Sequence, residues 1–171
     1  MMTAGHPDQL ADAVKLGHRK FPTGVTVVAA CGPTGPVGLA VNAFSSVSLD
    51  PPTVMFCVAR TSKTYASLLA VDRVCINILS EDQADVVRTF AVSGGDKFAS
   101  IRWHPGETGA PVLDGSAAYF EAILEVRLPA YSHEIFLGRV VASSTEPGKR
   151  PMVYYDGSMH DVDGHLLDGA R

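Results

Sequence analysis

Residues 42–60 read NAFSSVSLDPPTVMFCVAR, a stretch whose two halves differ in character. The first half offers small and hydroxyl side chains where a buried barrel strand usually carries Val, Ile and Leu. The second half, residues 54–59, is almost wholly apolar, and Asp50-Pro51-Pro52 separates the two. Small polar side chains leave the backbone edge of a strand open, so a flat ligand can hydrogen-bond to its N–H and C=O groups. The pattern predicts a ligand-facing strand beside a core strand.

The composition predicts a single domain with a core of its own. A chain of 171 residues buries roughly 70% of its unfolded surface. Hydrophobic residues make up 46% and charged residues 19%, and this apolar balance suggests an oligomer interface in addition to the core. We expect one domain over residues 1–171, with residues 1–14 and 158–171 as termini that the pattern defines less well.

Charge and hydropathy argue against two classes of partner. The net charge is −4, and no run of Lys and Arg is longer than a pair such as Lys149-Arg150, so a nucleic-acid backbone has no electrostatic counterpart in the chain. The apolar runs, such as residues 25–31, are too short to span a membrane, and the N-terminal segment lacks the pattern of a signal peptide. We expect a cytoplasmic protein without nucleic-acid or membrane partners.

Apolar runs separated by Gly and Pro predict a mainly β domain. Predicted strands cover residues 24–31, 37–44, 53–59, 73–79, 118–128 and 134–143, and segments 151–155 and 165–167 would close the sheet. Predicted helices cover residues 7–21 and 63–71, and a third runs from a capping-box pattern at residues 80–83 to Gly94-Gly95. Asp96 is suited to capping a further short helix. This order favours a closed antiparallel barrel with peripheral helices, and an open α+β sheet is the alternative.

Several familiar catalytic patterns are missing from the sequence. There is no GxGxxG, HExxH or GxSxG motif, and the histidines are scattered, so we expect neither a Rossmann nucleotide site nor a metal. Ser45 and Ser46 have no His or Asp nearby in sequence that would make either a nucleophile. The cysteines, Cys31, Cys57 and Cys75, lie in apolar runs without CxxC spacing, so we interpret them as reduced core residues.

Two basic segments are candidates for a phosphate site. Thr61-Ser62-Lys63-Thr64 stands where a strand leads into a predicted helix, and the N–H groups and partial positive charge of a helix start attract anions. An N-cap with a solvated cation explains the same residues. Lys97, after Gly94-Gly95-Asp96, is a second phosphate contact or part of a capping loop. His133 is either a functional histidine or an ordinary loop histidine.

Five segments together resemble the short-chain flavin reductase family, the reductase components of two-component flavin-dependent monooxygenases. They are FPTGVTVV at 21–28, GLAVNAFSSVSLDPPTVMFCVARTSKT at 38–64, GGDKF at 94–98, SHEIFLGRV at 132–140 and PMVYYDG at 151–157. The resemblance spans residues 15–160. It implies a split β-barrel with peripheral short helices, and a homodimer that binds FMN or FAD at its interface and reduces the flavin with NADH or NADPH.

The resemblance also assigns site residues by position. The isoalloxazine ring would be lined by Val41, Asn42, Ala43, Phe44, Ser45, Ser46 and Val47, with Cys57, Val58 and Ala59 on the neighbouring strand. The phosphate end of the cofactor would be held by Arg60, Ser62, Lys63, Thr64, Lys97 and Phe98, although many relatives carry a smaller polar residue than Arg60. His133 would be the catalytic residue near the nicotinamide, and Tyr154 or Tyr155 would contact the pyridine nucleotide.

The implied reaction passes a hydride from nicotinamide C4 to flavin N5, so the protein has to orient two rings and stabilise the reduced flavin. The product would leave for a separate monooxygenase as diffusible reduced flavin. Two alternatives remain open at this point: a non-catalytic module that binds or stores flavin, and a split-barrel oxidase of the pyridoxamine-phosphate type.

Overall fold

The structure is a computed structural model that describes residues 7–165 and 167. Its elements, in chain order, are α1 (Pro7–His18), β1 (Thr23–Gly24), β2 (Thr26–Gly32), β3 (Gly35–Val41), β4 (Phe44–Leu49), β5 (Pro52–Ala59), α2 (Tyr65–Leu69), β6 (Arg73–Ile78), α3 (Ala84–Ala91), β7 (Trp103–Pro105), β8 (Pro111–Leu113), β9 (Ala118–Ala130), β10 (His133–Thr145), β11 (Val153–Tyr155) and β12 (Ser158–His160). The mainly β architecture with short helices, predicted above, is confirmed.

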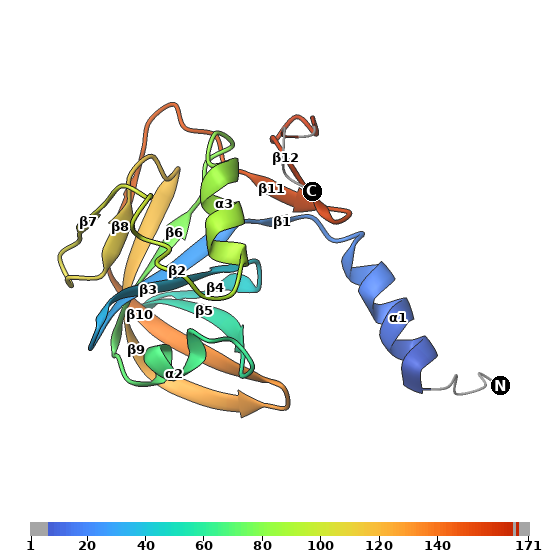
Figure 1. Cartoon of the computed structure of the whole chain (residues 1–171), viewed down its shortest axis with the longest axis horizontal. Helices are drawn as coiled ribbons and strands as arrows, with labels where there is room; N and C mark the ends of the chain where they lie inside the picture. The colour runs from blue at the N-terminus through green and yellow to red at the C-terminus, as the bar shows by residue number, and fades with distance from the viewer. Residues whose placement is uncertain (1–6, 166, 168–171) are drawn as a thin grey trace.

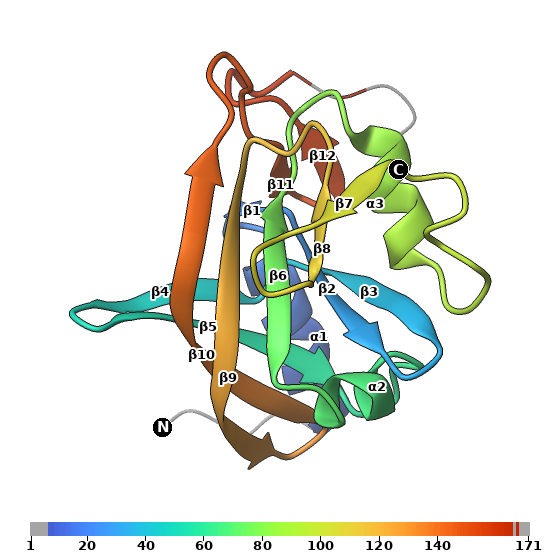
Figure 2. The same ribbon diagram turned by 90° about the vertical axis from the view of Figure 1, so that its left-hand side faces the viewer.

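One curled antiparallel sheet dominates the fold (Figures 1 and 2). Its strand order is β3-β2-β6-β9-β10-β5-β4, so β3 and β4 are its two edges although they follow one another in the chain. The barrel is therefore split between β3 and β4, and it is not the closed barrel that the strand pattern alone favoured. Only Asn42 and Ala43 separate the two edge strands.

The apolar run of β2 is explained by burial on both of its faces. Val28 and Ala30 point into the barrel interior, where Phe56 and Phe136 stack with ring centroids 5.0 Å apart. Val27 and Ala29 point to a second core on the outside of the sheet, and α3 covers this core. Strands that are covered on both faces lose the usual alternation of apolar and polar residues.

The helices are shorter than the sequence predicted. Helix α1 ends at His18, and α2 is a single turn that begins at Tyr65 and not at Lys63. Helix α3 begins at Ala84 and ends at Ala91, before Gly94-Gly95. Only half of the predicted capping box forms: Gln83 Oε1 accepts the Ser80 N–H at 3.0 Å, while the Ser80 hydroxyl donates to the Gly115 carbonyl. Asp96 caps a turn and not a helix, because Phe98 and Ala99 both donate to its Oδ1.

Some strand predictions need correction as well. The predicted strand 37–44 is broken, since β3 ends at Val41 and β4 begins at Phe44. The loop around His104 contains the short pair β7–β8, whose three-residue strands are too brief to leave a periodic signal. Strand β11 pairs with β1 and β12. His165 and Leu167 are not part of a strand, and the prediction for Leu166 lies outside the described residues.

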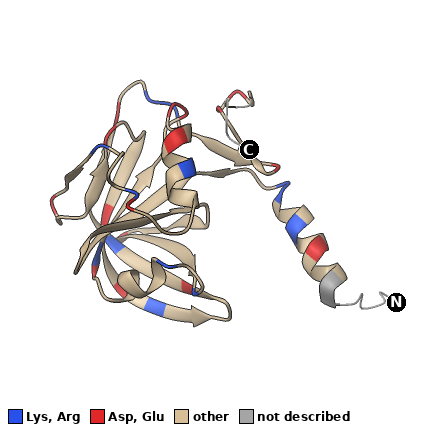
Figure 3. Cartoon of the chain, viewed as in Figure 1, with Lys and Arg blue, Asp and Glu red and all other residues tan. Residues whose placement is uncertain are grey.

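Helix α1 projects away from the barrel (Figure 1), and charged residues lie among other residues along it (Figure 3). Leu10 is 63% exposed and Leu16 is 62% exposed, and Phe21 just beyond the helix is 71% exposed. Leu49, at the far end of β4, is 86% exposed. Among the described residues, no helix combines the length and apolar character needed to cross a membrane.

Candidate functional site

The joint between the two edge strands is held tightly by hydrogen bonds. Thr26 Oγ1 donates to the Val41 carbonyl at 2.6 Å, and the Cys57 N–H donates to the Ala43 carbonyl at 3.0 Å. The Phe44 N–H in turn donates to the Asn42 carbonyl at 2.9 Å. The backbone of this joint is thus fixed from β2 on one side and β5 on the other.

Strand β4 has the exposed character that its small polar residues predicted. It pairs with β5 alone in the described sheet, and the pairing is irregular between Ser46 and Ser48. Ser45, Ser46 and Val47 are exposed, while Phe44 is half-buried and stacks on Phe120 with ring centroids 6.0 Å apart. An edge strand of this kind presents backbone groups that no neighbouring strand satisfies.

A large cavity of about 820 Å³ opens between this joint and helix α1. It brings three predicted ring-binding residues together with one predicted nicotinamide contact and with residues that precede the barrel. Its lining residues are Asp12, Lys15, Leu16, His18, Arg19, Phe21, Thr23, Asn42, Ala43, Phe44, Met55 and Tyr154. Ligand sites are commonly concave and mostly apolar with a few polar groups, and this lining fits that description.

A second, basic cavity of about 180 Å³ lies at the other end of β3. It lies between the segment after β5 and the GGDKF loop, the two segments that the sequence offered as candidates for a phosphate site. Its lining residues are Pro36, Val37, Gly38, Lys63, Thr64, Ser67, Gly94, Gly95, Asp96, Lys97 and Phe98. The Lys63 ammonium lies so close to Gly94 that a Cβ there would stand 3.3 Å from Nζ.

Lys97 is anchored at the floor of the basic cavity. Its Nζ donates to the Phe90 carbonyl at 3.1 Å and to the Gly38 carbonyl at 3.3 Å, and it lies 5.8 Å from the centre of the Phe90 ring. Because an ammonium has three N–H donors, one donor remains for a ligand. Burial lowers the pKa of the Lys97 ammonium below its ordinary value.

The segment 60–64 is a turn and not the start of a long helix. The Ser62 N–H donates to the Ala59 carbonyl, and the Ser62 hydroxyl accepts the Thr64 N–H at 3.3 Å. Since α2 has only 5 residues, its end offers little of the dipole expected from the sequence. The positive charge of this cavity comes from Lys63 and Lys97.

Arg60 turns toward the barrel wall. Its Nη2 lies 3.0 Å from Glu134 Oε2 and its Nε lies 3.3 Å from the same oxygen. Tyr65 also donates its hydroxyl to Glu134 Oε2, at 3.1 Å. Desolvation, followed by the hydrogen bond to Glu134, raises the pKa of Tyr65, so the hydroxyl stays protonated and donates.

The residues predicted to meet the nicotinamide lie in different places. His133 begins β10, is exposed, stands opposite Ala59 in the ladder, and lies 2.9 Å from the Ser132 hydroxyl through Nδ1. It lines neither of the two cavities. Tyr154 lines the large cavity, whereas Tyr155 is partly exposed and packs edge-on against the His160 ring at 6.0 Å.

Three of the predicted contacts have their side chains in the cores. Val41 and Val58 belong to the barrel interior, and Phe98 packs in the second core against Phe90. Any contact of Val41 or Val58 with a ligand would therefore be made through the backbone. Cys57 and Ala59 are half-buried on the opposite face of β5.

The cysteines are free, as predicted, but they do not all belong to the core. Cys75 is buried and Cys57 is half-buried, and desolvation raises the pKa of both thiols. Cys31 is exposed, which corrects the prediction, because the buried part of β2 ends at Ala30.

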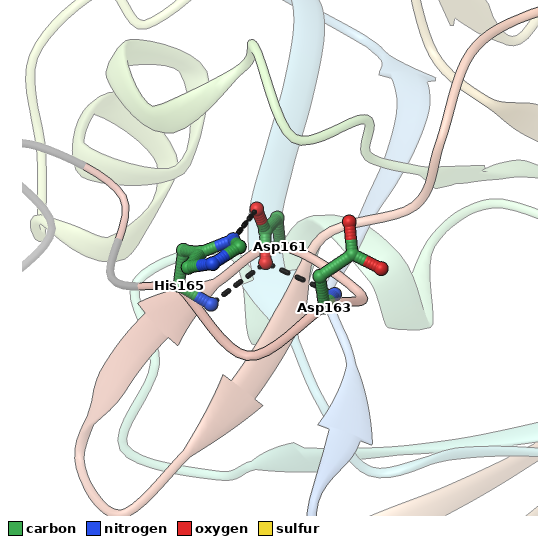
Figure 4. Close-up of side chains that lie close together, drawn as sticks. All are labelled: Asp161, Asp163 and His165. Carbon is green, nitrogen blue, oxygen red and sulfur yellow. Dashed lines mark hydrogen bonds and ion pairs between the residues drawn. The ribbon is translucent and has the colours of Figure 1, made fainter.

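A polar cluster near the C-terminus is used for local structure (Figure 4). Asp161 Oδ1 accepts the N–H groups of Asp163 and His165, and Asp161 Oδ2 lies 2.9 Å from His165 Nδ1. Arg150 lies 2.7 Å from Asp163 and 3.8 Å from Asp161. The three side chains could reach a common ion. The Arg150 guanidinium offsets part of the charge of the two aspartates, and the hydrogen bonds of Asp161 hold residues 161–165 in a turn.

Several lining residues were missed from the sequence. In the large cavity these are Met55, α1 side chains such as Lys15, and Arg19 just after the helix. Met55 carried a signal, since it alternates with buried Val54 and Phe56 along β5. Nothing in the sequence indicated that α1 would face the joint, because this depends on how the chain turns after His18.

Known proteins resemble this chain over most of its length. The chain matches the family described as "Flavin reductase like domain" over residues 18–163. A probable flavin reductase of Rhizobium meliloti (strain 1021) is 45% identical over 123 residues, which are 71% of this chain and 40% of that protein. This chain therefore spans less than half the length of that relative.

Two further relatives match over most of both chains. The reductase subunit HsaB of a flavin-dependent monooxygenase from Mycobacterium tuberculosis (strain CDC 1551 / Oshkosh) is 35% identical over 146 residues, covering 84% of this chain and 78% of the subunit. The solved structure of the NADH:FAD oxidoreductase SgcE6 from Streptomyces globisporus C-1027 superposes with a TM-score of 0.84 at 31% identity, covering 94% of this chain and 96% of that one.

Proposed function

The chain belongs to the flavin reductase like domain family, and from this premise we propose that it is an NAD(P)H:flavin oxidoreductase that supplies reduced flavin to a monooxygenase. The single observation that carries the proposal is the pairing of two cavities along β3. The large cavity holds the exposed joint Asn42–Ala43, and the basic cavity holds Lys63 and Lys97. A ligand that combines a flat ring with an anionic arm would place the ring in the large cavity and the arm in the basic cavity.

The spacing of the two cavities supports a flavin as the ligand. Gly38 lines the basic cavity and Asn42 lines the large one, and four residues of strand span about 13 Å. A ribityl phosphate arm can bridge such a distance. In this arrangement Lys63 and Lys97 bind the phosphate, while the joint and β4 bind the ring. The Thr64 hydroxyl already donates to the Gly38 carbonyl and braces the cavity wall.

The bound flavin would supply the redox chemistry. The protein would bind the flavin, orient the nicotinamide against it and shield both rings from water. The backbone N–H groups at the edge of β4 would stabilise the negative charge that reduction places on the ring, because fixed dipoles act strongly where charge develops. Phe44 would pack on the ring and exclude water. His133 would orient the nicotinamide, and Tyr154 would contact the pyridine nucleotide.

For the cofactor we propose FMN, with FAD as an alternative, and NADH as the donor. Two relatives named NADH:FMN oxidoreductase, from Rhodococcus qingshengii and Rhodococcus erythropolis, are 35% identical to this chain, and SgcE6 is named for NADH and FAD. Both kinds of flavin share the ring and the first phosphate, which are the parts that the two cavities fit.

We also propose that the protein works as a homodimer. The exposed apolar side chains Leu10, Leu16, Phe21 and Leu49 call for a covering surface. In one copy His133 lines neither cavity, so a second copy is also a means of completing the site. Light scattering on the purified protein would test this proposal, and a monomer at micromolar concentration would contradict it.

The test of the activity is anaerobic mixing of the purified protein with FMN and NADH while the nicotinamide absorbance is followed. We expect catalytic loss of NADH with reduction of many FMN molecules per protein. Tight flavin binding without NADH oxidation would instead indicate a flavin-storing module. Oxidation of an amine in the absence of NADH would indicate an oxidase.

A further inference from the structure

One buried carboxylate joins the two ends of the loop that lines the basic cavity. The side chain of Glu134 is 7% exposed, and its Oε2 accepts hydrogen bonds from Arg60 Nε and Nη2 and from the Tyr65 hydroxyl. Arg60 and Tyr65 are the residues directly before and after Thr61–Thr64. A single oxygen atom on β10 thereby fixes both ends of a four-residue loop.

Backbone hydrogen bonds tie the loop to the rest of the fold at few points. Within it, the Ser62 N–H donates to the Ala59 carbonyl and the Tyr65 N–H donates to the Ser62 carbonyl, so the hydrogen bonds are mostly local. The Arg60 N–H donates to the Ser132 carbonyl, which gives one further tie to the β9–β10 turn. The Thr64 hydroxyl also donates to the Gly38 carbonyl on β3, at 3.3 Å. Side-chain hydrogen bonds, from Thr64 to β3 and from Arg60 and Tyr65 to Glu134, therefore set the direction of Lys63 and Thr64.

The charges of the anchor are balanced within the barrel wall. An unpaired carboxylate at 7% exposure is costly, and the Arg60 guanidinium compensates for it with two N–H donors. The same pairing commits Arg60 to Glu134 and draws it away from a ligand phosphate. Lys63 and Lys97 are then the cations that face the basic cavity.

We propose that Glu134 is a positioning residue for phosphate recognition: through Arg60 and Tyr65 it holds the Thr61–Thr64 loop so that Lys63 and Thr64 face Lys97 across the basic cavity. This inference rests on the proposed function, and it goes further by giving Arg60 an indirect role. Glu134 also follows His133 directly on β10, so the same strand supports both the phosphate loop and the proposed nicotinamide contact.

The test compares FMN with riboflavin, which carries the same ring without the phosphate. For Glu134→Gln we expect the Kd for FMN to rise about tenfold, as for loss of hydrogen bonds to a charged group, while the Kd for riboflavin changes less than about twofold. In NADH oxidation, KM for FMN should rise with little change in kcat. Unchanged discrimination between FMN and riboflavin would overturn the proposal.

Two further variants separate positioning from loss of folding. Tyr65→Phe removes only the hydroxyl and should weaken FMN binding by about threefold, in the same direction as Glu134→Gln. The pair Arg60→Met with Glu134→Met removes both charges; if it folds with native stability but still binds FMN weakly, positioning by the pair is supported. If it binds FMN as tightly as the unaltered protein, the positioning role is wrong.

A matched control comes from the same sheet. Glu125 and Arg139 form a 2.8 Å ion pair between β9 and β10. Glu125→Gln therefore removes a carboxylate that pairs with an arginine, as Glu134→Gln does, but away from the Thr61–Thr64 loop. It should leave both flavin affinities unchanged. If the unaltered protein neither binds flavin nor oxidises NADH, the proposed function fails, whereas normal activity with intact FMN preference in Glu134→Gln defeats only the positioning role.

Discussion

Gly38 lies directly against the ring of Phe90. A Cβ added to Gly38 would stand 2.9 Å from Phe90 Cε1 and 3.1 Å from the Val28 carbonyl oxygen. The carbonyl of the same glycine accepts hydrogen bonds from Lys97 and Thr64. One position on an edge strand therefore sets both the packing of β3 on α3 and the floor of the basic cavity.

Gly38→Ala is expected to affect stability and ligand binding together. Crowding of this kind costs about 1–3 kcal/mol, and any shift of β3 moves the carbonyl that holds Lys97. Thermal unfolding and FMN titration measure the two effects. Gly24→Ala is the control, because a Cβ at Gly24 meets nothing within 4 Å. If the two variants had the same thermal stability and the same FMN affinity, Gly38 would not have this role.

Lys63→Ala should weaken the binding of FMN and leave the binding of riboflavin nearly unchanged. Loss of a charge-assisted contact to a phosphate corresponds to about tenfold in Kd. Flavin fluorescence quenching measures both ligands. Lys149→Ala, which removes the same charge from a distant pair with Asp82, is the matched control. If the variant loses affinity for FMN and riboflavin equally, Lys63 does not bind the phosphate.

The lowered pKa of Lys97 predicts a pH dependence of phosphate binding. The protonated ammonium attracts the phosphate, so affinity is present below the pKa of Lys97 and is lost as the pH rises through it. Because burial lowers this pKa, the loss should begin below about 10.4, the ordinary value for lysine. The ratio of FMN to riboflavin affinity measured against pH isolates the effect, and Lys97→Arg should flatten it.

His133→Ala is expected to slow flavin reduction about tenfold or more, because poor orientation of reacting rings is costly, while flavin affinity stays nearly intact. Stopped-flow absorbance gives the rate of reduction, and titration gives the affinity. His104→Ala, in an exposed pair with Asp114 at 3.0 Å, serves as control. A normal rate in the His133 variant would exclude the residue from the site.

Much of the fold could be predicted because its signals are local. The alternation in β9, the apolar runs of β2 and β5, and the turn at Asp50-Pro51-Pro52 are set by neighbours in sequence. The exposed strand of the candidate site was predictable for the same reason, since the small polar residues Ser45 and Ser46 do lie in an exposed edge strand.

Features that depend on distant contacts could not be predicted in this way. The direction of Arg60 is set by Glu134, which lies 74 residues away in sequence. Helix α2 is short because Thr61–Thr64 follows a turn that ties back to Ala59. The opening of the barrel between β3 and β4 depends on the curl of the whole sheet, and no single segment encodes it.

Strand β2 has a consequence for how the molecule unfolds. Its successive side chains alternate between the barrel interior and the core beneath α3, so the two cores share this strand. We infer that the two cores melt as a single cooperative unit. The helix layer that carries the GGDKF loop should then not fray independently, and amide exchange in α3 should be as slow as in the barrel strands.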